Sequence, residues 1–159
     1  MHDIALQLNS YNSAGGMGDI IFHDTDRAFG KKRSLQALLA RSDILLLQEM
    51  HSDNFEFQWL ENTWSHSHIF SWSHGTDRNC GGLCTAIKKQ VLLQYDFAFS
   101  IDIDPGRASI TFLIRNGTII ASANIHVPPQ WSLSEKKCLF DRLRRAVPSP
   151  QNAAAFALG

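Results

Sequence analysis

Cysteine is scarce in this chain, with three residues, Cys80, Cys84 and Cys138, among 159. Three unevenly spaced cysteines cannot form the disulfide framework of a small secreted domain. The first residues also lack the basic region and long apolar core of a signal peptide, because Asp3 and the polar stretch 7–13 stand there. The sequence therefore predicts an intracellular protein, in the nucleus or the cytoplasm.

An excess of charge of either sign is missing as well. Lys plus Arg number 15 and Asp plus Glu number 15, so charge alone does not point to a nucleic-acid partner. It does not exclude a nuclease either, because a bound divalent cation can supply the positive charge that a phosphate needs. The longest apolar runs, such as 44–47 and 153–158, are too short to cross a bilayer, so no membrane partner is expected.

Apolar residues are abundant, at 44% of the chain, and neither a repeat nor a linker interrupts them. This composition predicts one domain over residues 1–159. Period-two alternation predicts a strand at 4–8 followed by a loop at 9–18, and helical spacing predicts an amphipathic helix from about 25 to 41. A buried strand at 44–47 and a short helix at 54–62 follow, then strands at 69–72 and 83–87.

The clearest local signal is a hairpin. Asn116-Gly117 suits a type I′ turn, and alternating apolar residues flank it over 109–115 and 118–127. Ser132 and Glu135 then have capping-box spacing at the start of a helix that continues to about Val147. This order of elements predicts an α/β layer structure with a mixed sheet.

Three polar side chains follow predicted strands and could carry phosphodiester chemistry. Asn9 follows the first strand, Glu49 the buried strand and His126 the second hairpin strand. Mg²⁺ prefers carboxylate and amide oxygens, and strand ends commonly open onto a shared crevice. Taken singly, Asn9 is more commonly a turn residue, Glu49 a solvated strand-end acid and His126 a hydrogen-bonded, partly buried imidazole, so the residues alone leave the choice open.

A set of ordered motifs resembles the endonuclease/exonuclease/phosphatase (deoxyribonuclease I-like) family over residues 3 to about 147. The segments "IALQLNSYN" and "SDILLLQEM" resemble the family's opening strand and its "LQE" strand. The resemblance implies Asn9 and Glu49 as metal ligands, Glu49 also as a catalytic residue, and Mg²⁺ as the cofactor, with Mn²⁺ as a substitute. Metal-dependent cleavage of nucleic acid is the activity that the resemblance implies.

Later motifs bear on the substrate and the subfamily. "CGGLCTAIKK", "GRASITFL" and "ANIHVPPQ" are similar to the strands around the family's central hairpin. The resemblance implies that His126 is catalytic and contacts the substrate together with Arg107. Many members have tyrosine where this chain has His126, whereas the deoxyribonuclease I-like branch has a catalytic histidine. The Gly-Gly and Gly-Arg elements are typical of non-LTR retrotransposon endonucleases.

Two family motifs are missing from the sequence, an Asp-x-Asn motif and a terminal Ser-Asp-His. After His126 the chain has only two acidic residues, Glu135 and Asp141, and no histidine. The resemblance therefore implies a domain truncated at its C-terminus: an incomplete four-layer α/β sandwich with one mixed sheet, flanking helices and a second sheet largely missing. We expect an inactive or severely impaired fragment that self-associates through an exposed sheet face.

Other functions are compatible with the same residues. A non-catalytic nucleic-acid-binding or vestigial module, or a fragment of a lipid or inositol phosphatase, would use the same scaffold. Three histidines, His66, His68 and His74, with Cys80 and Cys84 could suggest zinc, but polar-loop histidines and a buried cysteine explain them better. The basic helix near Arg144 and the four tryptophans could contact nucleic acid, although a solvated helix face and core packing are the commoner roles.

Overall fold

The computed structural model describes residues 5–13, 26–51, 54–75 and 81–148, which form seven strands and four helices. The elements are, in chain order, β1 (Leu8–Asn12), α2 (Asp26–Arg41), β2 (Ile44–Gln48), α3 (Asn54–Trp64), β3 (His68–Ser73), β4 (Leu83–Lys88), α4 (Lys89–Leu92), β5 (Phe97–Asp104), β6 (Ala108–Arg115), β7 (Thr118–Ile125) and α5 (Leu133–Ala146).

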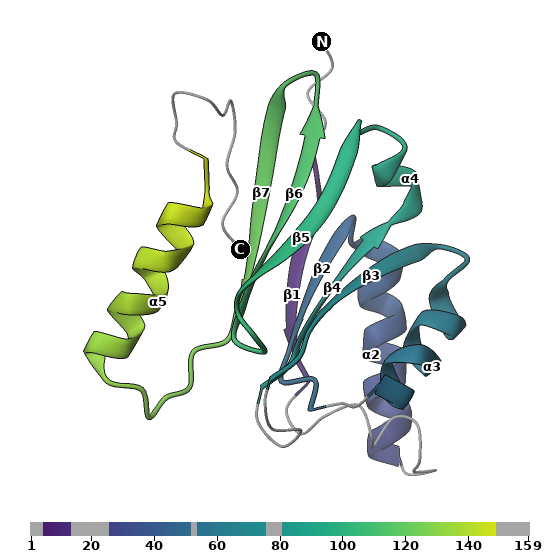
Figure 1. The fold of residues 1–159 in the computed structure, drawn as a ribbon. Coiled ribbons are helices and arrows are strands. Elements are labelled where there is room, and N and C mark those ends of the chain that lie inside the picture. Colours follow the sequence, from purple (N-terminus) through teal and green to yellow (C-terminus); the bar gives the residue numbers. More distant parts are fainter. Residues whose placement is uncertain (1–4, 14–25, 52–53, 76–80, 149–159) are drawn as a thin grey trace.

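The first sheet is mixed and has the strand order β1-β2-β4-β3. β1 pairs with β2 in parallel, and the other two pairs are antiparallel. Helices α2 and α3 lie against one face of this sheet (Figure 1). Leu45 and Leu47 of β2 pack there with Leu35 and Leu39 of α2 and Leu60 of α3, all at most 2% exposed. This buried face explains the continuous apolar run of β2, whose other face is also covered.

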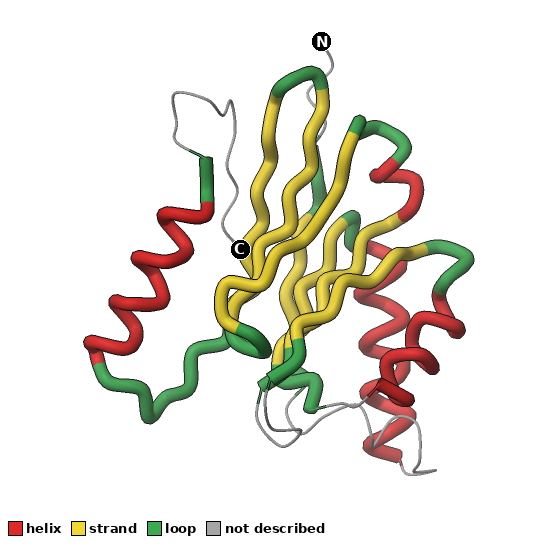
Figure 2. Tube along the Cα trace, viewed as in Figure 1, coloured by secondary structure: helices red, strands yellow, loops and turns green. Residues whose placement is uncertain are grey.

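The second sheet is antiparallel with the order β5-β6-β7, and helix α5 covers its outer face. Ile110 and Phe112 of β6 pack there against Leu139 and Leu143 of α5. The inner faces of the two sheets meet, because Ile44 and Leu46 of β2 contact the cluster that includes Leu113. The result is a four-layer α/β sandwich, in which the strands of both sheets run between the helices on either side (Figure 2). The predicted α/β class is confirmed.

The extent of the second sheet differs from the expectation that it is largely missing. Strands β5 to β7 form a sheet of three long strands, and its inner residues Thr111 and Leu113 are 2% and 1% exposed. The inner face of the first sheet is covered in the same way, with Thr85 at 2%. Strands β5, β6 and β7 cover the inner face at these positions, so the expected exposure of an inner sheet face is wrong there.

Strand β1 is displaced along the chain from its predicted position. The alternation of apolar residues predicted a strand at 4–8, of which residue 4 lies outside the described residues, whereas the ladder with β2 runs from Leu8 to Asn12. Four of the five residues of β1 are polar or aromatic, and Ser10 donates a hydrogen bond to Gln48 of β2. The position of β1 along the chain is therefore determined by its pairing with the buried strand β2 and not by the alternation of its own apolar residues.

Local signals elsewhere are confirmed. The hairpin turns at Asn116 and Gly117, whose φ angles of 50° and 77° are those of the predicted turn. Ser132 and Glu135 form the capping box of α5, and the hydrogen bonds from Ser132 lower the pKa of the Glu135 carboxyl below its usual value. Strand β5 and the single-turn helix α4 were not predicted, although Phe97, which opens β5, begins an alternating apolar pattern.

Exposed apolar side chains occur on edge strand β5. Phe97 and Phe99 are 68% and 49% exposed, and Ile101 on the same face is 37% exposed. Self-association therefore stays a prediction. The surface expected to mediate it is now edge strand β5 and not the inner face of a sheet. Of the helices in the described part of the chain, none combines the length and apolar character that crossing a membrane requires.

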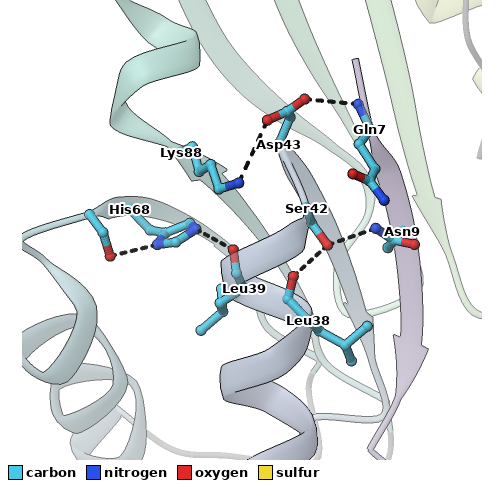
Figure 3. A network of polar contacts seen from close by, with 9 residues as sticks. Gln7, Asn9, Leu38, Leu39, Ser42, Asp43, His68 and Lys88 are labelled. Atoms are coloured by element: carbon cyan, nitrogen blue, oxygen red, sulfur yellow. Dashed lines mark hydrogen bonds and ion pairs between the residues drawn. The ribbon is translucent and has the colours of Figure 1, made fainter. Parts of the chain in front are cut away.

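One histidine is buried at the end of the first sheet opposite to Glu49. His68 opens β3 at 5% exposure, its Nδ1 atom 2.8 Å from Ser67 Oγ and its Nε2 atom 3.2 Å from the Leu39 carbonyl oxygen of α2 (Figure 3). Desolvation lowers the pKa of His68 below 6.5, and the Leu39 carbonyl only partly opposes this. His68 therefore fastens helix α2 to β3 in its neutral form.

We predict that His68 makes stability depend on pH. The unfolded chain takes up a proton at His68 near about pH 6.5, while the folded chain takes it up only at lower pH, so stability falls as pH is lowered from about 6.5 towards the folded-state pKa. Urea unfolding followed by tryptophan fluorescence at about pH 7.5 and about pH 5.5 gives the difference. His68→Gln should show a smaller loss than the wild type. His66→Gln keeps His68 but removes the smallest of the causes that lower its pKa, so it should retain most of the wild-type loss. Equal losses in the wild type and His68→Gln would contradict the prediction.

Candidate active site

Glu49 lies where the chain leaves β2. All five residues of β2 are buried, and the backbone then turns through a left-handed conformation at Glu49, with a φ angle of 57°. The amide of Met50, the next residue, donates to the carbonyl oxygen of Gly82 at 3.1 Å. This turn takes the carboxylate out of the sheet at the end of β2, where its side chain is 22% exposed. A non-glycine residue in this conformation is uncommon and is held there by the contacts around it.

The carboxylate of Glu49 lies between two imidazole rings. His126 contacts Oε1 of Glu49 through its Nε2 atom, and His51 contacts Oε2 through its own Nε2 atom at 3.1 Å. The two imidazole side chains are 16% and 23% exposed, so the group is open to solvent on one side. The structure thus brings together two predicted residues, Glu49 and His126, and adds a third, His51, that the sequence analysis did not single out.

A buried pair of amide side chains aligns the strands that carry this group. Gln48 Nε2 of β2 donates to Asn124 Oδ1 of β7 at 2.8 Å. Asn124 Nδ2 donates to the carbonyl oxygens of Leu47 at 3.1 Å and Cys84 at 3.0 Å, on two strands of the first sheet. Asn124 is 1% exposed and Gln48 8%. Gln48 directly precedes Glu49, and Asn124 stands two residues before His126. The hydrogen bond between the two amides therefore holds the Glu49 carboxylate and the His126 imidazole close to each other.

The loop after β7 is fixed to the turn between β5 and β6. The backbone amide of His126 donates to the carbonyl oxygen of Arg107 at 2.8 Å. The Arg107 guanidinium lies next to Gly81, because a Cβ atom built on that glycine would be 3.0 Å from Arg107 Nη1 and 2.6 Å from the Gly106 carbonyl oxygen. Gly81 also has a positive φ angle of 76°, so both space and conformation require glycine there. Arg107, predicted to bind substrate, therefore lies at the same end of the sheets as His126.

Asn9 is not part of this group, and its predicted role beside Glu49 is wrong. Asn9 pairs with Leu45, four residues before Glu49 along β2. Its Nδ2 atom donates to Ser42 Oγ at 2.8 Å, and Ser42 donates in turn to the Leu38 carbonyl oxygen of α2 (Figure 3). The side chain of Asn9 thus fastens β1 to the end of helix α2, at the start of β2 and not at its end.

Asn12 takes the place that was predicted for Asn9. The parallel register sets Asn12 opposite Gln48, the residue that precedes Glu49. Alternation along β1 turns Asn12 to the same side as Ser10, which donates to Gln48 Oε1 at 3.2 Å. Asn12 is exposed. The error came from ending the first strand too early, because both asparagines are followed by polar residues and only the pairing with β2 separates them.

The donors at this end of the sandwich match a hard divalent cation in kind. Glu49 offers a carboxylate and Asn12 an amide oxygen, the ligand types that Mg²⁺ prefers alongside water. Within the described ranges, no three His, Cys, Asp or Glu side chains are arranged to hold a metal ion. By ligand type alone, Glu49 and Asn12 match part of a magnesium shell. Cys84 does not suit the zinc alternative, because it is buried in β4 and burial raises the pKa of its thiol, whereas zinc binds a thiolate. Cys80, the other cysteine of that alternative, lies outside the described residues.

The fold and this group of side chains define a two-sheet α/β sandwich with a candidate hydrolytic site at one end. The chain belongs to the endonuclease/exonuclease/phosphatase family, whose model matches residues 9–159. No curated protein matches the chain in sequence.

Solved structures share the fold. An AP endonuclease from Leishmania major superimposes with a TM-score of 0.65 at 18% identity over 96% of this chain. TDP2 from D. rerio, in complex with a single-strand DNA product, gives a TM-score of 0.56 at 18% identity, also over 96%. The chain spans only 54% and 59% of the lengths of these two proteins. At this identity the likeness establishes the fold.

We predict that the amide of Asn124 is a principal support of the sandwich. Asn124→Ala removes the buried donor to the carbonyl oxygens of Leu47 and Cys84 and leaves the Gln48 amide with only a long contact, 3.4 Å, to the Leu46 carbonyl oxygen. The free energy of unfolding should therefore fall by about 3 kcal/mol. Urea unfolding of both proteins measures the change.

Ser122→Ala is a matched control on the same strand. The buried Ser122 hydroxyl has no hydrogen-bond partner among the described residues, so its removal should change stability by less than about 0.5 kcal/mol or increase it. A loss at Asn124 no larger than that at Ser122 would contradict the supporting role.

Proposed function

We propose that this chain forms the Glu49-containing part of a metal-dependent phosphodiesterase site that acts on nucleic acid. The observation that carries the proposal is the meeting of Glu49, His126 and the end of β1 at one edge of the sandwich. Membership of the family supports hydrolytic chemistry, and the chain's own residues supply the details below. Gly81-Gly82 and Gly106-Arg107 favour the retrotransposon type within the family.

Each residue has a distinct role in this proposal. Glu49 and Asn12 would hold Mg²⁺, or Mn²⁺ in its place, and the cation would neutralise charge on the phosphate. His126 lies within reach of the same position and would contact a phosphate oxygen or hold a proton for the departing oxygen. Arg107 would bind a neighbouring phosphate, for which its planar guanidinium is suited. The buried amide pair keeps Glu49 and His126 in place and contacts no substrate.

Nucleic acid is the proposed partner, although the sequence has no net charge. The D. rerio TDP2 structure contains a single-strand DNA product, and the L. major protein is named as an AP endonuclease. In this chain the cation and Arg107 would provide the positive charge for one or two phosphates, so an overall basic surface is not required. Binding is therefore expected to be weak and sensitive to salt.

Turnover by the 159 residues alone is expected to be very low. Within the described part of the site, Glu49 is the only carboxylate that contacts His126, and the sequence has no histidine after His126 to activate water. Catalytic groups that act as a unit lose most of their effect when some are absent. The same observation favours the second candidate function, a module that binds a cation and nucleic acid without turnover.

We predict that Mn²⁺ binds this chain through Glu49. Isothermal titration with Mn²⁺ should detect binding by the wild type, and Glu49→Gln should weaken it by at least about 10-fold because the charged ligand is removed. Asp141→Asn, on helix α5 at the outer face of the second sheet, is a control of equal charge change and should bind as the wild type does. Equal affinity in the wild type and Glu49→Gln would contradict the cation site.

Plasmid nicking then separates the two candidate functions. With Mg²⁺ or Mn²⁺ present, nicking by the wild type that EDTA stops and Glu49→Gln lacks supports an enzyme. Binding of DNA that decreases with salt, without any nicking, supports the non-catalytic module. Rapid nicking by the purified 159 residues would overturn the expectation of low turnover, and nicking that Glu49→Gln retains would overturn the site itself.

A further inference from the structure

His51 is a second imidazole in contact with Glu49, and neither the family match nor the resemblance in the sequence assigns it a role. Its Nε2 atom is 3.1 Å from Oε2 of Glu49, while His126 contacts the other oxygen, Oε1. A carboxylate oxygen can only accept, so each imidazole donates its Nε2–H. The two oxygens of Glu49 therefore have separate donors from two segments, the loop after β2 and the loop after β7.

The backbone holds His51 in a conformation that it would not adopt freely. Its φ angle is 43°, in the left-handed region that non-glycine residues rarely occupy. The amide of His51 donates to the Gly81 carbonyl oxygen at 3.0 Å, next to the bond from Met50 to Gly82. Gly82 donates in turn to the Gly106 carbonyl oxygen at 3.0 Å. The turn of the second sheet is thus connected through Gly81 and Gly82 to His51, the residue that contacts Glu49. The strained backbone of His51 is retained because these surrounding contacts fix it.

These contacts remove a freedom that Glu49 would otherwise have. A glutamate at a loop turn has three side-chain torsions, and ordering them costs conformational entropy when a ligand must do it. With Oε2 held by His51, the carboxylate plane is already set and Oε1 faces His126. We propose that His51 is a positioning residue, which holds one oxygen of Glu49 so that the other is presented to the cation and to His126. This inference rests on the proposed cation site.

The expected size of the effect follows from the chemistry of metal ligands. Residues that hydrogen-bond to a metal ligand orient it, and their removal typically weakens metal affinity by about 10-fold to 100-fold. His51 is an outer partner in this sense. It contacts Glu49 and is not proposed to contact the cation.

Three substitutions at one position test the role. His51→Gln places an amide nitrogen close to the position of Nε2 and should keep the contact with Glu49. His51→Asn carries the same amide on a shorter side chain, which corresponds to Nδ1 and does not reach, and His51→Ala has no donor. We predict that Mn²⁺ affinity falls by about 10-fold to 100-fold in His51→Ala and His51→Asn, and by less than about 3-fold in His51→Gln. Circular dichroism and urea unfolding are the checks that each variant is folded.

A readout without metal keeps this inference separate from the proposed function. Long-range proton–nitrogen NMR spectra of the wild type should show His51 with its proton on Nε2, and Glu49→Ala should shift the ring nitrogens of both His51 and His126. An unshifted His51 ring in Glu49→Ala overturns the pairing, whether or not Mn²⁺ binds. If the pairing is present and the wild type binds no Mn²⁺, the proposed function and the positioning role towards a cation are both overturned, while the contact itself stands.

The pattern of Mn²⁺ affinities decides the role when binding is present. Loss in His51→Ala and His51→Asn with retention in His51→Gln supports positioning through Nε2. Equal affinity in all four proteins overturns it. Nitrogen coupling in the Mn²⁺ electron spin echo spectrum that disappears in His51→Gln would also overturn it, because His51 would then be a ligand of the cation.

Discussion

The site depends on one buried contact, the amide pair of Gln48 and Asn124. Apolar side chains between two sheets resist sliding through their packing, but they specify a register less sharply than hydrogen bonds do, because dispersion contacts have no strong directional preference. Asn124 specifies the register, since its amide bonds to Gln48 and to the carbonyl oxygens of Leu47 and Cys84 at once. Hydrogen bonds require distance and direction, and in a buried place a displaced amide would lose them without water to replace them.

The Glu49 carboxylate and the His126 imidazole meet because the amide pair, one and two residues before them in the chain, aligns the two strands that carry them. Glu49 follows Gln48 and His126 follows Asn124 by two positions, so a fixed register between β2 and β7 becomes a fixed distance between carboxylate and imidazole. The turn at Gly106 completes this arrangement, since its carbonyl oxygen accepts from Gly82 and the next carbonyl, of Arg107, accepts from His126. Loops that are individually irregular are thereby held by the rigid sheets.

The sequence predicted those elements whose signals are local. The Asn116-Gly117 turn and the capping box of α5 each depend on residues that are neighbours in the chain, and the amphipathic pattern of α2 repeats over several turns. The first strand was misplaced, because its polar residues Asn9 to Asn12 look like a loop until β2 is paired with them. Glu49 and His126 were found from their positions after strands, whereas His51 was missed because nothing local distinguishes a loop histidine that contacts a carboxylate.

By itself, the sequence determined the α/β class and the order of most elements, and it singled out Glu49 and His126, two residues of the candidate site that meet in the structure. These follow from hydrophobic periodicity and turn chemistry, which act over a few residues. Only the tertiary structure decided which asparagine lies opposite the end of β2, that Asn124 bonds to the first sheet and that His51 contacts the Glu49 carboxylate. Each of these depends on register between strands distant in the chain, and a shift of a few residues in register, which the pattern of β1 does not forbid, would exchange Asn12 for Asn9.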